Sequence, residues 1–122
     1  MGTTNTGKAA VAGLINNIGS ITAFTYLAYG DDTTAFGATQ TALVGTESQR
    51  AAATCTRQTT TVTNDTTQWA KTFTISATET IGEVGVFNAS SAGIMGWRSV
   101  LATPRSVASG DSYVCTYKVA IT

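Results

Sequence analysis

The most informative segment of the chain is Ile81-Gly-Glu-Val-Gly-Val-Phe-Asn-Ala-Ser-Ser-Ala-Gly-Ile-Met-Gly-Trp-Arg98. Two runs rich in β-forming residues flank the small and polar residues Ala89 to Ala92, which is typical of a β-hairpin with a four-residue loop. In that arrangement Asn88 lies opposite Gly93, and every later pair follows from the same register. We therefore expect five further pairs: Phe87 with Ile94, Val86 with Met95, Gly85 with Gly96, Val84 with Trp97, and Glu83 with Arg98.

The expected register gives the hairpin two different faces, because successive side chains point to opposite sides of a strand. One face is apolar and is expected to join the core: Val84, Val86, Met95 and Trp97. The other face pairs Glu83 with Arg98 as an exposed ion pair across the strands. Exposed ion pairs contribute about 0–1 kcal/mol, whereas truncation of a buried Trp to Ala costs about 3–5 kcal/mol. With Trp97 packed against Val84, we expect Trp97→Ala to destabilise the protein far more than Glu83→Gln.

The rest of the chain carries further strand patterns separated by turn signals. We expect strands at 20–29, 54–63, 68–77 and 113–121, a loop at 31–40, and either a turn or a short helix at 41–50. In the last strand Cys115 shares a side with Tyr113 and Tyr117, which places its thiol in the core. Many short strands after one helix predict an all-β fold, an antiparallel β-sandwich over residues 20–122 that follows a short N-terminal helix or arm over residues 1–19.

The N-terminal segment has the pattern of an amphipathic helix over residues 7–18, with Thr6 as N-cap and Gly19 just past its end. Its apolar residues recur at the spacing of one helical face: Val11, Leu14, Ile15 and Ile18. A helix of this length is marginal alone and must dock on something. We expect the apolar stripe to form an interface with a neighbouring copy or shell protein; the alternative is a helix that caps the open end of its own sandwich.

The composition fits one neutral domain without a polyanionic partner. The chain has 122 residues, 43% hydrophobic and 11% charged, and a formal net charge of zero, which argues against nucleic acid and anionic membranes as partners. It shows no basic leader and no apolar run of membrane-spanning length, so we expect neither cleaved secretion nor membrane insertion. Threonine accounts for 25 residues, which suits a surface that lies against a neighbouring subunit, although neutral strands of an ordinary β-protein have the same composition.

The residues available for chemistry argue against catalysis. The sequence contains no histidine, which removes the commonest general base and most zinc sites. Neighbouring acidic residues such as Asp31 and Asp32 are typical of turns, and no spaced set of carboxylates indicates a calcium loop. We therefore expect no enzyme activity, no metal and no cofactor. The two cysteines, Cys55 and Cys115, are compatible with one disulfide, but without a secretory signal free thiols are favoured.

Three segments of the sequence, in order, carry a resemblance to a known group of proteins. They are Leu43-Val-Gly-Thr-Glu-Ser-Gln-Arg50, Gly82-Glu-Val-Gly-Val-Phe-Asn-Ala89 and Ser109-Gly-Asp-Ser-Tyr-Val-Cys-Thr-Tyr117. The trio resembles the Leu-Gly-Thr-Glu…Arg, Glu-x-Gly-Leu-Phe-Asn-Ala and Gly-Asp-x-Leu elements of small tailed-bacteriophage virion structural proteins, from about Tyr26 to the C-terminus. This chain departs from them by an inserted Val44 and by Tyr113 in place of an aliphatic residue.

The resemblance implies a non-enzymatic virion protein, assembled in the host cytoplasm. Such proteins are capsid decoration, head-fibre or tail-fibre components. We expect a capsid decoration (cement) protein that binds the head shell as a homo-oligomer, with itself and the major capsid protein as partners. The alternative is a tail or tail-fibre component that contacts tail proteins and carries a host-glycan-binding face.

Overall fold

The computed structural model describes residues 2–122, which form one helix and eight strands. Their bounds, in chain order, are β1 (Gly2–Thr3), α1 (Asn5–Asn16), β2 (Tyr26–Gly30), β3 (Glu47–Ala52), β4 (Thr54–Gln58), β5 (Thr66–Thr74), β6 (Glu79–Phe87), β7 (Met95–Val107) and β8 (Ser112–Ala120). All strand pairs are antiparallel.

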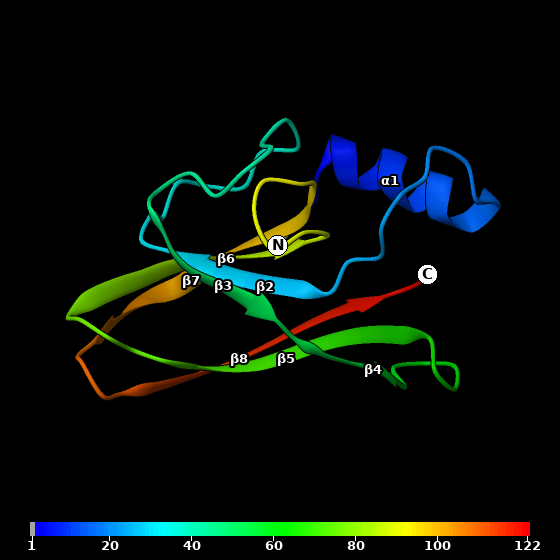
Figure 1. Cartoon of the computed structure of the whole chain (residues 1–122). Helices are drawn as coiled ribbons and strands as arrows, with labels where there is room; N and C mark the ends of the chain where they lie inside the picture. Colours follow the sequence, from blue (N-terminus) through cyan, green and yellow to red (C-terminus); the bar gives the residue numbers. More distant parts are fainter. Residues whose placement is uncertain (1) are drawn as a thin grey trace.

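The strands form two packed layers (Figure 1). One sheet has five strands in the order β1-β7-β6-β2-β3, and the other has three in the order β4-β5-β8. The predicted all-β antiparallel sandwich with a short N-terminal helix is thus confirmed. The strands β3 and β4 follow each other through Ala53 and lie in different sheets, so the chain itself joins the two layers on that side. On the opposite side, the edges of β7 and β8 face each other without pairing within residues 2–122.

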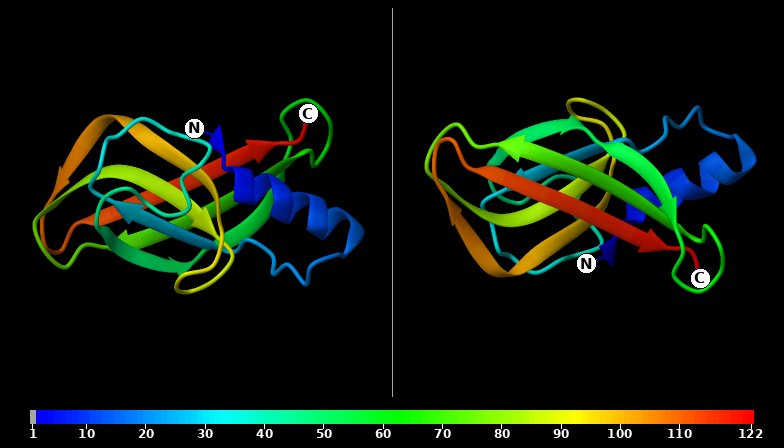
Figure 2. Two further views of the ribbon diagram at one scale, coloured as in Figure 1. Left: turned by 90° about the horizontal axis from the view of Figure 1, so that it is seen from above. Right: turned by 90° about the horizontal axis from the view of Figure 1, so that it is seen from below.

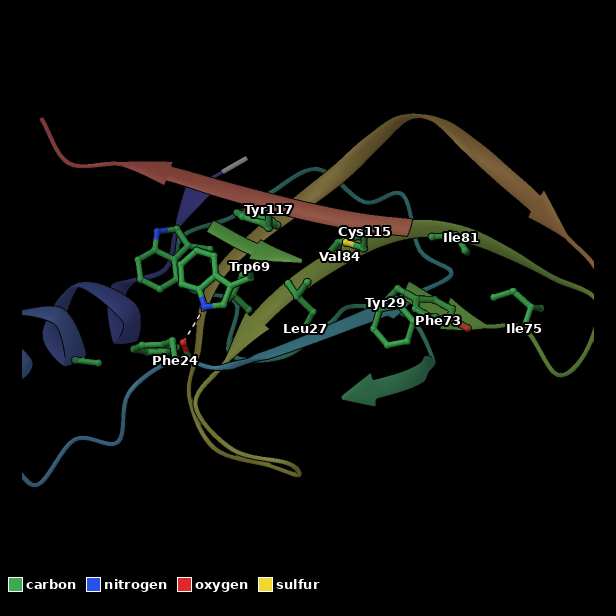
Figure 3. Packing of buried hydrophobic residues seen from close by; sticks show 13 residues of the cluster. Phe24, Leu27, Tyr29, Trp69, Phe73, Ile75, Ile81, Val84, Cys115 and Tyr117 are labelled. Carbon is green, nitrogen blue, oxygen red and sulfur yellow. Dashed lines mark hydrogen bonds between the residues drawn. The ribbon is translucent and has the colours of Figure 1, made fainter. Parts of the chain in front are cut away.

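The core between the sheets is built mainly from aromatic side chains (Figure 3). Trp69 of β5 donates a hydrogen bond from its indole Nε1 to the carbonyl oxygen of Phe24 over 2.7 Å. The rings of Trp69 and Trp97 have centroids 5.5 Å apart, and those of Tyr29 and Phe73 meet edge to face at 5.0 Å. These contacts link both sheets, because Trp69 and Phe73 come from β5 whereas Tyr29 and Trp97 come from the five-stranded sheet.

A second apolar cluster covers the outer face of the five-stranded sheet. It consists of Ala28, Leu43, Phe87 and Met95, with Tyr26 packed beside it. Leu43 belongs to the long loop 31–46, which lies over the strands of this sheet (Figure 2, left view). The loop explains why β2 and β6 carry apolar residues on both faces: each face of these strands is buried.

The ion pair between Glu83 and Arg98 lies beneath this loop, and its expected exposure is wrong. The Nε of Arg98 is 2.9 Å from Oε1 of Glu83, and both side chains are fully buried. The Glu83 carboxylate also accepts hydrogen bonds from the backbone N–H groups of Asp32, Val44 and Gly45. The pair therefore fastens the covering loop to the sheet.

The register of the β6–β7 hairpin also differs from the expected one. Trp97 lies opposite Val86 rather than Val84, and Arg98 lies opposite Gly85 rather than Glu83. The register shifts between Val86 and Phe87, where an irregularity lengthens the connection relative to a four-residue loop. From Glu83 to Val86 the displacement amounts to two residues, so Val84, Val86 and Trp97 keep their face. Val84 and Trp97 consequently share the main core although they are not cross-strand partners. Phe87 pairs with Met95 at a displacement of one, and Met95 is therefore buried with Phe87 in the outer cluster, so its expected place on the core face is wrong.

Several expected element bounds are also wrong. The strand predicted at 20–29 begins only at Tyr26, and the one at 54–63 ends at Gln58. The segment 41–50 contains no helix and becomes β3 from Glu47. After β4, the turn 59–65 is closed by the carboxylate of Asp65, which accepts the backbone N–H groups of Thr60, Thr61 and Val62 and so competes with strand pairing. The last strand agrees with β8, and Cys115 is buried as predicted.

Candidate assembly surface

Helix α1 begins two residues earlier than the sequence predicts. Its N-cap is Thr4 rather than Thr6, and Thr4 Oγ1 accepts the backbone N–H of Gly7 over 2.9 Å. The same hydroxyl is fully buried and donates to the carbonyl oxygen of Met95 over 2.6 Å. At the other end the C-cap is Asn17 in the left-handed conformation, not Gly19. The cap therefore also anchors the helix on β7.

The helix packs on its own sheet through its smallest residues. Gly7 and Ala10 are its buried positions, and a Cβ atom at Gly7 would overlap the carbonyl oxygen of Gly96 in β7. A close approach of this kind needs glycine, because any side chain would push the two backbones apart. The docking face of α1 is thus a small-residue face, which lies beside the apolar stripe that the sequence predicts.

The predicted stripe remains mostly outside the core. Leu14 is 40% exposed and Ile15 82% exposed, while Val11 is partly buried against the core cluster. Ile18 is 67% exposed and lies beyond the end of the helix. Exposed large apolar residues that cluster on one surface mark an interaction site. The structure therefore leaves this stripe available for a neighbour even though α1 is docked on its own sandwich.

Three residues of the stripe form one wall of an apolar groove of about 600 Å³, here called the α1 groove, whereas Ile18 lines a separate hollow beside Ile21 and Ile94. Val11, Leu14 and Ile15 lie on the helix side, and the end of β8 contributes Val119 and the exposed Ile121. The buried rings of Trp69 and Trp97 also line it. Within residues 2–122, the indole Nε1 of Trp97 has no hydrogen-bond partner. The groove thus combines apolar walls with one unpaired donor.

The α1 groove is almost free of charge. Among its lining residues in the part of the chain that the structure describes, Lys8 is the one charged side chain. The helical spacing of apolar residues in the sequence predicts the half of the groove that α1 contributes. It did not point to Trp69, Trp97 and Ile121, because they come from distant segments that only the folded chain brings together.

Outside the α1 groove, two titratable side chains with raised pKa values, Cys115 and Tyr113, lie in or against the core. Burial raises the pKa of Cys115 to about 11, and burial also raises the pKa of Tyr113 to about 12.

Within residues 2–122, no group of three or more Cys, Asp or Glu residues is placed to hold a metal ion. No helix in that part of the chain is long and apolar enough to cross a membrane. Both cysteines are free thiols, as the sequence analysis favoured.

Two of the three segments that carried the resemblance, 43–50 and 82–89, contact each other in the fold. The guanidinium carbon of Arg50 lies 3.6 Å from the centre of the Phe87 ring, and Arg50 Nη1 donates to the carbonyl oxygen of Ala89. Glu83 accepts from Val44 and Gly45, as described above. A change in one segment therefore affects the packing of the other.

Comparisons with known proteins agree with a virion protein. A search of curated proteins finds no match. A family model described as Podophage GP4 fiber I protein gp80 matches residues 4–120. That range runs from the N-cap of α1 to the last residue of β8, and so includes every element from α1 onward. The chain therefore belongs to the family of the Podophage GP4 fiber I protein gp80, a family of phage virion structural proteins.

Proposed function

We propose that this protein is a non-enzymatic structural component of a phage fibre and that the α1 groove attaches it to its neighbour in the virion. The observation that carries the proposal is the family match over residues 4–120, because the family is described as a fibre protein. This description favours a fibre over the decoration role that the sequence analysis preferred. A decoration protein on the head shell remains the alternative.

The surface of the domain supports a role in assembly. Leu14 and Ile15 are exposed on a helix whose own docking face is already satisfied by Gly7 and Ala10. Burial of an exposed aliphatic side chain contributes about 1.5–3 kcal/mol, so two or three such residues are enough to position a subunit. The near absence of charge in the groove favours an apolar partner surface over a charged one. We propose tail or fibre proteins, together with copies of this chain, as those partners.

The proposal is tested by incorporation into particles. Phage that lacks the gene is complemented with wild-type protein, with Ile15→Asp, or with Val62→Asp, and the chain is then quantified in purified virions by mass spectrometry. Ile15 and Val62 are both largely exposed, at 82% and 65%, so neither change is expected to lower the melting temperature. We expect virions to contain the wild-type and Val62→Asp chains and to lose most of the Ile15→Asp chain.

Two results would contradict the proposal in different ways. If the wild-type chain is absent from purified virions, it is not a structural component. If Ile15→Asp is incorporated as well as wild type, the α1 groove is not the attachment surface, whatever the location of the protein.

A further inference from the structure

The strand β8 is the long open edge of the three-stranded sheet. It pairs with β5 along nine residues, from Ser112 to Ala120, and no strand of residues 2–122 pairs with its other side. An open edge presents a row of unpaired backbone N–H and C=O groups, which is a template for another strand. Proteins that must avoid such pairing shorten the edge, place charges or proline on it, or cover it.

The other edges of the sandwich are protected in these ways, whereas β8 is not. On the five-stranded sheet, β1 has two residues and β3 carries the Glu47–Arg50 ion pair. The edge strand β4 is short, with five residues against nine in β8. The free part of β7 contains Pro104 and Arg105. By contrast, β8 contains no proline, and Lys118 is its one charged residue.

The sheet face beside this edge is open, and Lys118 is the one charged residue that β8 places on it. Trp69 faces the core, so its neighbour Ala70 points outward, in one row with Thr54 of β4 and Thr116 of β8. No helix or loop lies in front of β5 and β8 when the molecule is seen from below (Figure 2, right view). The outer face of the three-stranded sheet is therefore uncovered along β5 and β8.

We propose that β8 pairs antiparallel with β8 of a second copy of this chain, about a two-fold axis at Thr116. The two three-stranded sheets then form one continuous six-stranded sheet. In this register each Thr116 faces its own symmetry copy. Lys118 faces Val114 of the partner subunit, so the two ammonium groups are not opposed. The proposal concerns a different surface from the α1 groove and goes beyond the proposed function.

The inner side of the edge also favours a second copy. A groove of about 520 Å³ lies between β7 and β8; its lining includes Val84, Leu101, Tyr113 and Tyr117 together with the charged Arg105 of β7. The hydroxyl of Tyr117 is buried and has no hydrogen-bond partner within residues 2–122. In the proposed register Tyr117 faces Cys115 of the partner subunit. The neighbouring strand therefore extends the core side of the sheet with aromatic and small apolar side chains.

The register is tested by charge at its centre, with the isolated protein in solution. Thr116→Lys and Thr116→Glu are studied separately and as an equimolar mixture by sedimentation velocity over a range of concentrations. Each variant alone places like charges opposite each other, and we expect its dimer dissociation constant to rise about tenfold or more. The mixture is expected to restore dimers. The control is Thr54→Lys, which lies in the same row on the opposite edge and should dimerise like wild type.

A cross-link provides a second measurement that does not depend on charge. In a Cys55→Ser background, which removes the exposed thiol, Thr116→Cys is expected to form a disulfide-linked dimer under mild oxidation. Facing residues in antiparallel strands have Cα atoms about 4.5–5.5 Å apart, within the range of a disulfide. Thr54→Cys in the same background is the control.

The proposal is overturned by a wild-type chain that stays monomeric at all concentrations. It is equally overturned by Thr116→Lys dimers as tight as wild type, or by a Thr54→Cys cross-link that forms as readily as the Thr116→Cys one. These measurements use no virion, so their failure is distinguishable from failure of the fibre assignment.

Discussion

Arg98 reaches diagonally across β6 and β7 to Glu83, with 2.9 Å between Nε and Oε1, and neither side chain is exposed to solvent. The second guanidinium branch donates to the carbonyl oxygen of Thr34 and to Oε1 of Gln40, both in the covering loop 31–46. Glu83 accepts three backbone N–H groups from the same loop or its ends. One buried pair thus holds a loop of sixteen residues against the sheet, and Leu43 of that loop covers the second apolar cluster.

The first prediction follows from this burial. Removal of one partner from a buried pair leaves an uncompensated charge and typically costs about 3–5 kcal/mol. We expect Glu83→Gln to reach that range and to match Trp97→Ala, for which truncation of a buried Trp also costs about 3–5 kcal/mol. The sequence alone predicts that Trp97→Ala is far more destabilising than Glu83→Gln, because it treats the Glu83–Arg98 ion pair as exposed. That prediction no longer holds, since the pair is buried. Chemical denaturation of both variants measures the two costs.

The chain offers a matched control for this comparison. Glu47 pairs with Arg50 over 2.7 Å, but its side chain is 33% exposed. We expect Glu47→Gln to cost about 0–1 kcal/mol, as is usual for exposed pairs. If Glu83→Gln costs no more than Glu47→Gln, the buried pair does not secure the loop.

The second prediction concerns the contact between α1 and β7. Gly7→Ala raises intrinsic helix propensity by about 1 kcal/mol, yet its Cβ would overlap the carbonyl oxygen of Gly96. We expect a net loss of stability and weaker protection of the α1 amides in hydrogen exchange. Lys8→Ala, at the next and exposed position, is expected to change stability by less than about 0.5 kcal/mol. A more stable Gly7→Ala protein would show that the helix does not sit this closely on β7.

The third prediction separates the two thiols. Cys55 is exposed on β4, whereas Cys115 is buried and its pKa is raised to about 11 by that burial. Because the thiolate is the reactive form, iodoacetamide at pH 8 is expected to modify Cys55 alone in the folded protein. Both thiols should react in denaturant. Rapid modification of Cys115 under native conditions, detected by peptide mass spectrometry, would mean that β8 opens locally or that its inner side is accessible.

The fourth prediction concerns acid stability. Three backbone N–H groups hold the pKa of Asp65 well below its ordinary value of about 3.9. The charged form is therefore favoured in the folded state, and its contribution is fully present above about pH 4 and declines as the pH falls toward the folded pKa. We expect wild type to be more stable than Asp65→Asn at pH 6, with a difference that shrinks below pH 4. A difference that stays constant from pH 6 to pH 2.5 in chemical denaturation would contradict this role.

Much of the fold follows from local patterns. The alternation around Cys115 and the β-prone runs on both sides of Asn88 predict β6, β7 and β8, because the residues that decide them are neighbours in the chain. The apolar period at Val11, Leu14 and Ile15 likewise predicts the helix and its exposed stripe.

The rest depends on segments that are distant in sequence. Glu83 lies on the face opposite the main core, which ordinarily means solvent, and only the loop 31–46 makes it buried. The close contact of Gly7 with Gly96 could not be predicted from the sequence, because a glycine does not indicate whether its position is buried. The hairpin register was missed because an irregularity beside Phe87 adds length to a loop that the sequence pattern places at four residues.

Cryo-electron microscopy of intact particles is the decisive measurement of whether this chain is a fibre component of a phage virion. The domain has a distinctive shape, with α1 at one end of a two-layer sandwich, so its density is recognisable. We expect copies of the domain within a fibre, with α1 and the end of β8 against a neighbouring subunit. Copies found only on the outer surface of the head shell, in the manner of a decoration protein, would contradict the fibre assignment.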